Sequence, residues 1–173
     1  MKGTAHLSEC ELYRYTLDRV WGDQPDNRLV WLMLNPSTAD AEKDDPTIRR
    51  CIAFSCGFGY DALRVVNLFA LRATNPMDLV DSLESGVALN DCAADTLLHD
   101  ATSGEGVVVA WGAHGGRWPG RDRVREVLGF LRPASLSCLG RTKDGHPKHP
   151  LYVKGNSPLT EWSPAIRAVG AIP

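Results

Sequence analysis

An apolar run over residues 30–34 ends in Asn35-Pro36, and this junction constrains the fold more than any other segment. A short apolar run of this kind is typical of a strand buried in a parallel sheet. Proline disfavours helical geometry in the residue before it, so the strand should end at Asn35. Open α/β sheets bind ligands beyond the carboxyl ends of their strands. Asn35 therefore lies either at a ligand site or in an Asx-turn that only satisfies backbone groups.

Strand-like and helix-like segments alternate along the whole chain. The predicted strands cover residues 28–34, 62–68, 106–111 and 136–139, with an edge strand at 13–17, and the predicted helices cover 45–57, 77–83, 90–101 and 121–131. This alternation predicts an α/β fold, a three-layer α/β/α sandwich around a central, mainly parallel four-stranded sheet. The chain has 173 residues, 43% of them apolar, and no dividing linker. We therefore expect a single α/β domain over residues 1–173, acting as a monomer.

Charge and cysteine content narrow the classes of function. The net charge of −2 gives no overall basic signature for nucleic acid. The five cysteines are scattered and form no CxxC pair, which indicates reduced thiols rather than a disulfide framework or a structural zinc site. Residues 1–11 lack the apolar stretch of a signal peptide, and no run approaches the length of a membrane span. We therefore expect a cytoplasmic protein that does not associate with membranes.

A second amide, Asn67, lies near the end of the apolar run over residues 62–68. A buried amide without hydrogen-bond partners costs about 1–3 kcal/mol. Asn67 therefore either braces a neighbouring loop or pairs with an amide-like ligand edge. Pyrimidine bases present such an edge, and an amide offers it one donor and one acceptor.

Two histidine-containing loops follow later strands. Residues 111–116 form a glycine-rich turn, in which Trp111 fits core packing and His114 is either a ligand contact or a surface residue that caps the turn. The loop over residues 140–152 contains two His-Pro steps, and a histidine there can stabilise a developing anion. This loop also contains the basic residues Arg141, Lys143 and Lys148, which suit either phosphate contacts or a solvated turn. The loop histidines have no carboxylate or thiolate companions nearby, so we expect no metal and no cofactor.

The order of these segments resembles that of the motifs in the uracil-DNA glycosylase superfamily. Its first motif reads G-x-D-P-Y or G-x-N-P-G, and Met33-Leu34-Asn35-Pro36-Ser37 is similar to the second form. Its central strand reads L-L-N-T-V-L-T-V-R-A, which residues 65–73 resemble. Its W-G-S/A-H strand end is matched by residues 111–114, and its H-P-S-P-L loop resembles His149-Pro150-Leu151 in shortened form. Separately, the whole chain resembles an uncharacterised bacterial and phage family with an L-N-P-S-T-A-D signature.

The glycosylase resemblance implies a fold and a reaction. The fold would be uracil-DNA-glycosylase-like, and the reaction would be hydrolysis of the N-glycosidic bond of uracil or a 5-substituted uracil in DNA. Such enzymes act by base flipping in base-excision DNA repair, without a cofactor or metal. The resemblance implies that Asn35 holds the attacking water, that Asn67 reads the pyrimidine edge, and that His149 donates to the base O2.

Further positions carry roles under the same resemblance. Leu34, Pro36, Ser37 and His114 would contact the substrate base, Leu151 would insert into the base stack, and Arg141, Lys143 and Lys148 would bind DNA phosphates. Phe54 would stack on the flipped base, or else pack in the core. The loop lacks the second proline of the family motif, which leaves His146 as the alternative to His149.

Two departures from the family pattern affect the predicted chemistry. Asn35 cannot accept a proton, so a nearby acid would be the general base, and we assign this role to Asp40. Asp44 or Asp45 could take that role instead, or could cap the helix that follows. Ser37 is small where one branch places a tyrosine that rejects a 5-methyl group. We therefore predict tolerance of 5-hydroxymethyluracil.

Two other functions remain open. One is a hydrolase or transferase that acts on free nucleotides or nucleobases in the same pocket. The other is a non-catalytic module that binds modified DNA. A basic stripe around the pocket, formed by Arg72, Arg141, Lys143, Lys148 and Lys154, would favour DNA. Acidic residues at the same mouth would favour a free nucleotide.

Overall fold

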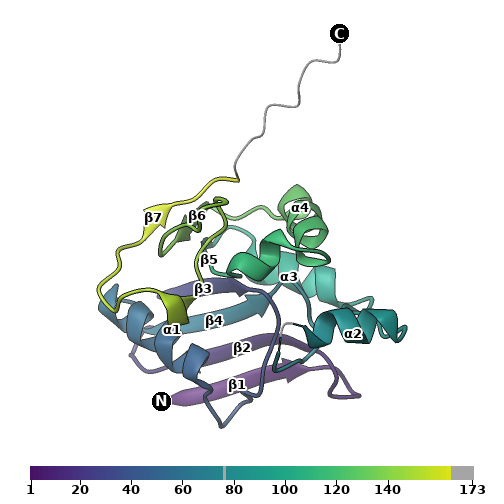
Figure 1. Ribbon diagram of the computed structural model, residues 1–173. Coiled ribbons are helices and arrows are strands. Elements are labelled where there is room, and N and C mark those ends of the chain that lie inside the picture. The colour runs from purple at the N-terminus through teal and green to yellow at the C-terminus, as the bar shows by residue number, and fades with distance from the viewer. Residues whose placement is uncertain (76, 165–173) are drawn as a thin grey trace.

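The protein is a mixed α/β fold, seen here in a computed structural model that describes residues 1–75 and 77–164 (Figure 1). Its strands are β1 Lys2–Leu7, β2 Arg14–Val20, β3 Arg28–Met33, β4 Ala62–Asn67, β5 Gly106–Val109, β6 Ser135–Cys138 and β7 Thr160–Glu161. Its helices are α1 Pro46–Gly57, α2 Asp78–Glu84, α3 Ala94–Thr102 and α4 Gly120–Phe130, with short 3-10 helices η1 Ala113–Gly116 and η2 Pro150–Tyr152. Each predicted helix and strand is present, with its ends shifted by a few residues.

The sheet has seven strands in the order β1-β2-β4-β3-β5-β6-β7, so the predicted four-stranded sheet is too small. The central strands β4, β3, β5 and β6 pair in parallel. β2 joins β4 antiparallel, and β1 and β7 complete the two sides in the same antiparallel sense. The predicted edge strand at 13–17 is therefore an interior strand, covered by β1. β1 was not predicted from the sequence, because its residues alternate between exposed and half-buried and form no apolar run.

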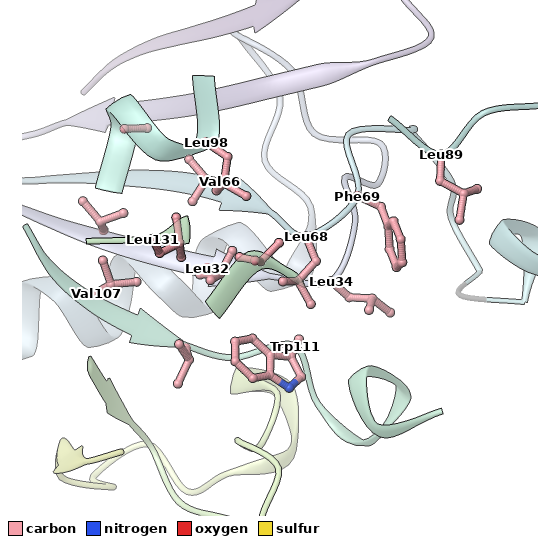
Figure 2. Packing of buried hydrophobic residues seen from close by; sticks show 14 of the residues in the cluster. Leu32, Leu34, Val66, Leu68, Phe69, Leu89, Leu98, Val107, Trp111 and Leu131 are labelled. Atoms are coloured by element: carbon pink, nitrogen blue, oxygen red, sulfur yellow. The ribbon is translucent and has the colours of Figure 1, made fainter. Parts of the chain in front are cut away.

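Helices pack on both faces of the sheet. Alternate residues of β3 point to opposite faces, with Val30 and Leu32 in one apolar cluster and Trp31 and Met33 in the other. The first cluster includes residues of α3 and α4, and Figure 2 shows Leu32 and Leu131 within it. The second cluster includes the buried face of α1. A sheet between two helical layers puts its strand ends, and the loops that follow them, at one exposed edge.

The amino terminus of α1 is fixed by local chemistry. Asp45 has an extended backbone, and its carboxylate accepts a hydrogen bond from the backbone N–H of Ile48 at 2.8 Å. Pro46 occupies the first helical position, where a missing N–H costs nothing. The prediction that Asp44 or Asp45 caps this helix is confirmed for Asp45. The same helix contacts η2, which brings residues 150–152 close to α1.

Candidate functional site

A cavity of about 580 Å³ lies at the carboxyl ends of the parallel strands. Its walls come from the ends of β3 and β4, from the turn after β5, from the start of α1 and from the loop after β6. The lining includes eight residues that the sequence predicted for the site: Leu34, Asn35, Ser37, Asn67, His114, Lys148, His149 and Leu151. Loops that are far apart in the sequence therefore meet at one cavity.

Asn35 is fixed in orientation by two backbone carbonyls. Its amide nitrogen Nδ2 donates to the carbonyl oxygen of Ala73 at 2.7 Å and to that of Pro36 at 3.0 Å. Both donor positions are used, so the carbonyl oxygen Oδ1 is the group that Asn35 can present to a ligand. The side chain thus braces the loop after β4 and also offers an acceptor to the cavity, which combines the two alternatives that the sequence left open.

Asn67 ends β4 and is buried, and its Oδ1 atom accepts no hydrogen bond from the described residues. A buried acceptor without a donor costs about 1–3 kcal/mol. Asn67 lines the cavity, where a ligand N–H would supply the missing donor. The bracing alternative for Asn67 is not supported, because no described group bonds to this oxygen.

His149 precedes η2, and its Nδ1 atom accepts a hydrogen bond from the backbone N–H of Leu151 at 3.3 Å. An accepting Nδ1 carries no proton, so the neutral ring carries its proton on Nε2. Burial lowers the pKa of His149 to about 4, and the negative charge of Asp45 opposes this effect only in part. The imidazole is therefore neutral near pH 7 and offers one N–H to a ligand. His146 is absent from the cavity lining, which favours His149 between the two histidines.

The three acids near the start of α1 have different positions. Asp40 does not line the cavity, and its Oδ1 accepts the backbone N–H groups of Glu42 and Lys43, which lower its pKa. Asp44 forms a salt bridge with Arg19 at 2.8 Å. Asp45 lines the cavity as well as capping α1. The structure therefore places Asp40, the residue assigned as the general base, outside the cavity lining, and Asp45 is the acid that a ligand there could contact.

Several other predicted residues lie away from the cavity lining. Phe54 is buried in the α1 face, where its ring stacks on Phe58 at 5.9 Å, so it is a core residue and not a stacking platform for a base. Pro36 is buried, and its carbonyl oxygen accepts a hydrogen bond from the amide of Asn35.

The predicted DNA-binding residues Arg141 and Lys143 also lie outside the cavity lining. Arg141 donates to the carbonyl oxygens of Glu161 and Ser163, and Lys143 is exposed. Of the predicted basic stripe, Lys148 alone contributes to the lining.

Sequence reasoning missed Arg14, a buried arginine that lines the cavity. Its strand pairs with β1 irregularly, because the register jumps from Thr16 to Arg14 opposite His6 and Leu7. This bulge places Arg14 among the buried residues of β2 with Leu17 and Arg19. The alternating pattern over residues 13–17 gave no sign of a bulge and predicted only an edge strand.

Gly112 sets the distance between two loops of the site. Its φ angle is +72°, in the region that favours glycine. A Cβ atom at this position would lie 3.3 Å from the Cβ of His149. The turn after β5 can therefore approach the histidine loop closely because residue 112 has no side chain.

The described residues contain no group of three or more His, Cys, Asp or Glu side chains arranged to hold a metal ion. In the same part of the chain, every helix is too short or too polar to cross a membrane.

Comparison with known proteins gives one match. The model of a family described as "Protein of unknown function (DUF1643)" matches residues 14–151. This range contains every residue that lines the cavity except Tyr152. Comparisons with curated proteins and with solved structures give no significant match. Because the family model covers most of its length, the chain belongs to the DUF1643 family.

Proposed function

We propose that this protein is a DNA glycosylase with a uracil-DNA-glycosylase-like fold, which hydrolyses the N-glycosidic bond of uracil or a 5-substituted uracil. The observation that carries the proposal is the convergence of Asn35, Asn67 and His149 on one cavity. Each of these side chains has a free hydrogen-bonding group of the kind that its role requires. The cavity volume of about 580 Å³ is in the range of small-molecule sites and accommodates an extruded nucleotide.

Asn67 and His149 would act on the base. The amide of Asn67 offers a donor and an acceptor, which complement the O4 and N3–H groups of a uracil ring. When the C1′–N1 bond breaks, its electron pair goes to the base and negative charge builds on O2. The Nε2–H group of a neutral His149 would donate to that oxygen, and a hydrogen bond of this kind strengthens as the charge develops.

Asn35 and Asp45 would act on the water. The Oδ1 atom of Asn35 would accept one O–H of a water and orient its oxygen towards C1′, because both amide hydrogens of Asn35 are held by carbonyls. As the new C1′–O bond forms, the water proton passes to the carboxylate of Asp45. Asp45 can keep one oxygen on the helix amide of Ile48 and use the other as the base.

The cavity mouth has features that suit an extended nucleic acid. Leu151 and Tyr152 line the cavity, yet their exposed fractions are 44% and 80%. Exposed apolar side chains beside a base pocket can fill the gap that a flipped base leaves in the stack. Lys148 adds a positive charge at the same loop. Ser37 is a small lining residue, which supports access for a substituent such as 5-hydroxymethyl.

An incision assay tests this proposal. Oligonucleotides with one uracil, 5-hydroxymethyluracil or hypoxanthine are incubated with the protein, and abasic sites are then cleaved with alkali. We expect incision at uracil or 5-hydroxymethyluracil. The variants Asn35→Ala and His149→Ala should each lower the rate by about 100-fold, which is typical for the loss of one transition-state hydrogen bond.

Asn156, which is exposed, and His99, whose side chain is 41% exposed, provide matched controls, because both lie outside the cavity lining. Asn156→Ala and His99→Ala should leave the rate unchanged. Absence of incision at every base would overturn the proposed activity. Incision that neither Asn35→Ala nor His149→Ala reduces would overturn the site assignment.

A further inference from the structure

Three arginines of the described residues are buried, and one of them has no carboxylate partner in the same part of the chain. Arg19 forms a salt bridge with Asp44, and Arg123 forms salt bridges with Asp95 and Glu126. Arg14 donates through Nη1 to the carbonyl oxygen of Ala39 at 2.8 Å, and no described carboxylate lies within 4.0 Å of it. Buried charges in proteins are normally paired, because desolvation is costly. An anion bound in the cavity would supply the opposite charge that no described side chain places within 4.0 Å of Arg14.

The position of Arg14 indicates where that anion would lie. Four buried side-chain polar atoms of the described residues have no hydrogen-bond partner. Three of the four belong to cavity-lining residues: Nε of Arg14, Oδ1 of Asn67 and Nε1 of Trp111. Figure 2 shows the indole nitrogen of Trp111 on the side of the ring away from Leu68. Unmet hydrogen-bonding capacity concentrated at one cavity is typical of a site built for a ligand.

Arg14 and Asn67 come from neighbouring strands, so a single small ligand can reach both. β2 pairs with β4, and the backbone N–H of Arg14 donates to the carbonyl oxygen of Ala70, three residues after Asn67. Burial lowers the pKa of Arg14 to about 10, and the charge of Asp45 acts in the opposite direction. The guanidinium still keeps its proton at pH 7. It therefore presents a permanent positive charge to the same cavity that Asn67 lines.

We propose that the cavity binds an anionic ligand, whose carboxylate or phosphate oxygens are held by Arg14 while an adjacent amide-like edge pairs with Asn67. The planar guanidinium suits oxyanions of both kinds, because its N–H groups match the spacing of their oxygens. An unmodified uracil supplies the amide-like edge and no charge. The ligand is therefore either a pyrimidine with an acidic ring substituent or a nucleotide whose phosphate enters the cavity.

This inference deepens the proposed glycosylase function, because it names the charge of the group that the same cavity accepts. Its test measures binding and does not depend on bond cleavage. Isothermal titration calorimetry at fixed salt compares two pairs of ligands with the wild-type protein: uracil with 5-carboxyuracil, and uridine with uridine 5′-monophosphate. We expect the anionic member of at least one pair to bind about tenfold tighter or more, as a charge-assisted hydrogen bond provides.

The two pairs distinguish the source of the charge. A preference for 5-carboxyuracil assigns the charge to the base, and a preference for the monophosphate assigns it to the phosphate of a nucleotide. Failure of both anionic ligands to bind more tightly than their neutral counterparts, including no binding of all four, overturns the inference. Incision of uracil in DNA without any preference for the anion would support the glycosylase proposal and overturn the anion inference. A preference for the anion without incision at any base would support the anion inference and overturn the glycosylase proposal.

Variants of Arg14 link the preference to this residue. Arg14→Met keeps the apolar stem and removes the charge, so it should abolish the preference for the anion. Arg14→Lys retains a charge without the planar fork and should restore part of it. Arg123→Met is the matched control, because it removes a buried guanidinium that does not line the cavity. Circular dichroism checks the folding of each variant, and an unchanged preference in folded Arg14→Met protein contradicts the inference.

Discussion

The side-chain amide of Asn35 donates to the carbonyl oxygen of Ala73, 38 positions further along the chain, at 2.7 Å. This bond joins the turn after β3 to the loop after β4, and a second bond to the carbonyl of Pro36 fixes the same nitrogen. A carboxylate at position 35 would face two carbonyl oxygens. It would repel both of them.

Asn35→Asp is therefore expected to destabilise the protein by about 2–4 kcal/mol, because it replaces two donors with a charged acceptor. Urea unfolding measures the change. The same substitution at the exposed Asn156 adds the same charge and should shift stability by less than about 0.5 kcal/mol. An Asn35→Asp protein as stable as the wild type would show that the amide of Asn35 does not hold these carbonyls.

Asn67→Leu should leave the free energy of unfolding unchanged or raise it by about 1 kcal/mol, because it removes a buried acceptor that has no described donor. The same variant should lose ligand binding. Thermal unfolding and calorimetric titration with uridine and uridine 5′-monophosphate give the two measurements. Asn90 is the control, since its amide is bonded to Ala70 and Leu68, and Asn90→Leu should be destabilising. A strongly destabilised Asn67→Leu protein would contradict this prediction.

Stability should depend on pH through His149. Burial lowers its pKa in the folded protein from 6.5 to about 4, so between these values the unfolded chain binds more protons than the folded one. Stability is thus retained above pH 6.5 and falls as the pH is lowered towards 4. His149→Gln should show a smaller loss between pH 7 and pH 4.5, measured by urea unfolding, with His99→Gln as the control for an exposed imidazole. Parallel losses in wild-type and His149→Gln protein would rule out this coupling.

The two roles of Asp45 can be separated by two substitutions. Asparagine caps a helix as well as aspartate does, so Asp45→Asn should keep stability within about 0.5 kcal/mol of the wild type. Asp45→Ala should lose about 1 kcal/mol. Both variants remove the carboxylate and should lower the rate of base excision to a similar extent. If Asp45→Asn kept the wild-type rate, the proton acceptor would have to be another group.

Leu151→Ala should reduce excision from duplex DNA by about tenfold and leave excision from single strands largely unchanged, because only a duplex requires the stack to be filled. Folding should be unaffected, since 44% of the side chain is exposed. Leu12→Ala is the control, being an exposed leucine outside the cavity lining. Equal effects on both substrates would indicate a packing role for Leu151.

The parts of the fold that the sequence predicted are those with strong local signals. Buried runs such as residues 28–34 and 62–68 have few alternatives to a central strand, and Pro46 after Asp45 marks a helix start. β1 and β7 lack such signals. β1 alternates without a fully buried face, and β7 has two residues whose pairing depends on β6. Both strands are specified by neighbours distant in sequence.

The site residues that could be predicted are likewise those with strong local sequence signals. Asn35, Asn67 and His149 follow recognisable strand ends or proline turns, so their convergence could be expected from the parallel topology. The place of Arg14 in the cavity could not be predicted in this way, because a bulge in β2 decides which face of the sheet Arg14 occupies. The prediction that Phe54 stacks on a base has a different difficulty, because the local sequence pattern does not identify its role. An aromatic residue on an amphipathic helix looks the same in sequence whether it packs in the core or stacks on a ligand.

The close approach at Gly112 has a practical consequence for redesign of the pocket. Any larger residue there would strain the backbone, and its Cβ would lie only 3.3 Å from the Cβ of His149. Libraries that aim to change ligand preference should hold position 112 constant and diversify wall residues such as Ser37, Thr74 and Thr142. The separation between the turn after β5 and the loop that carries His149 is thus set by Gly112, which has no side chain.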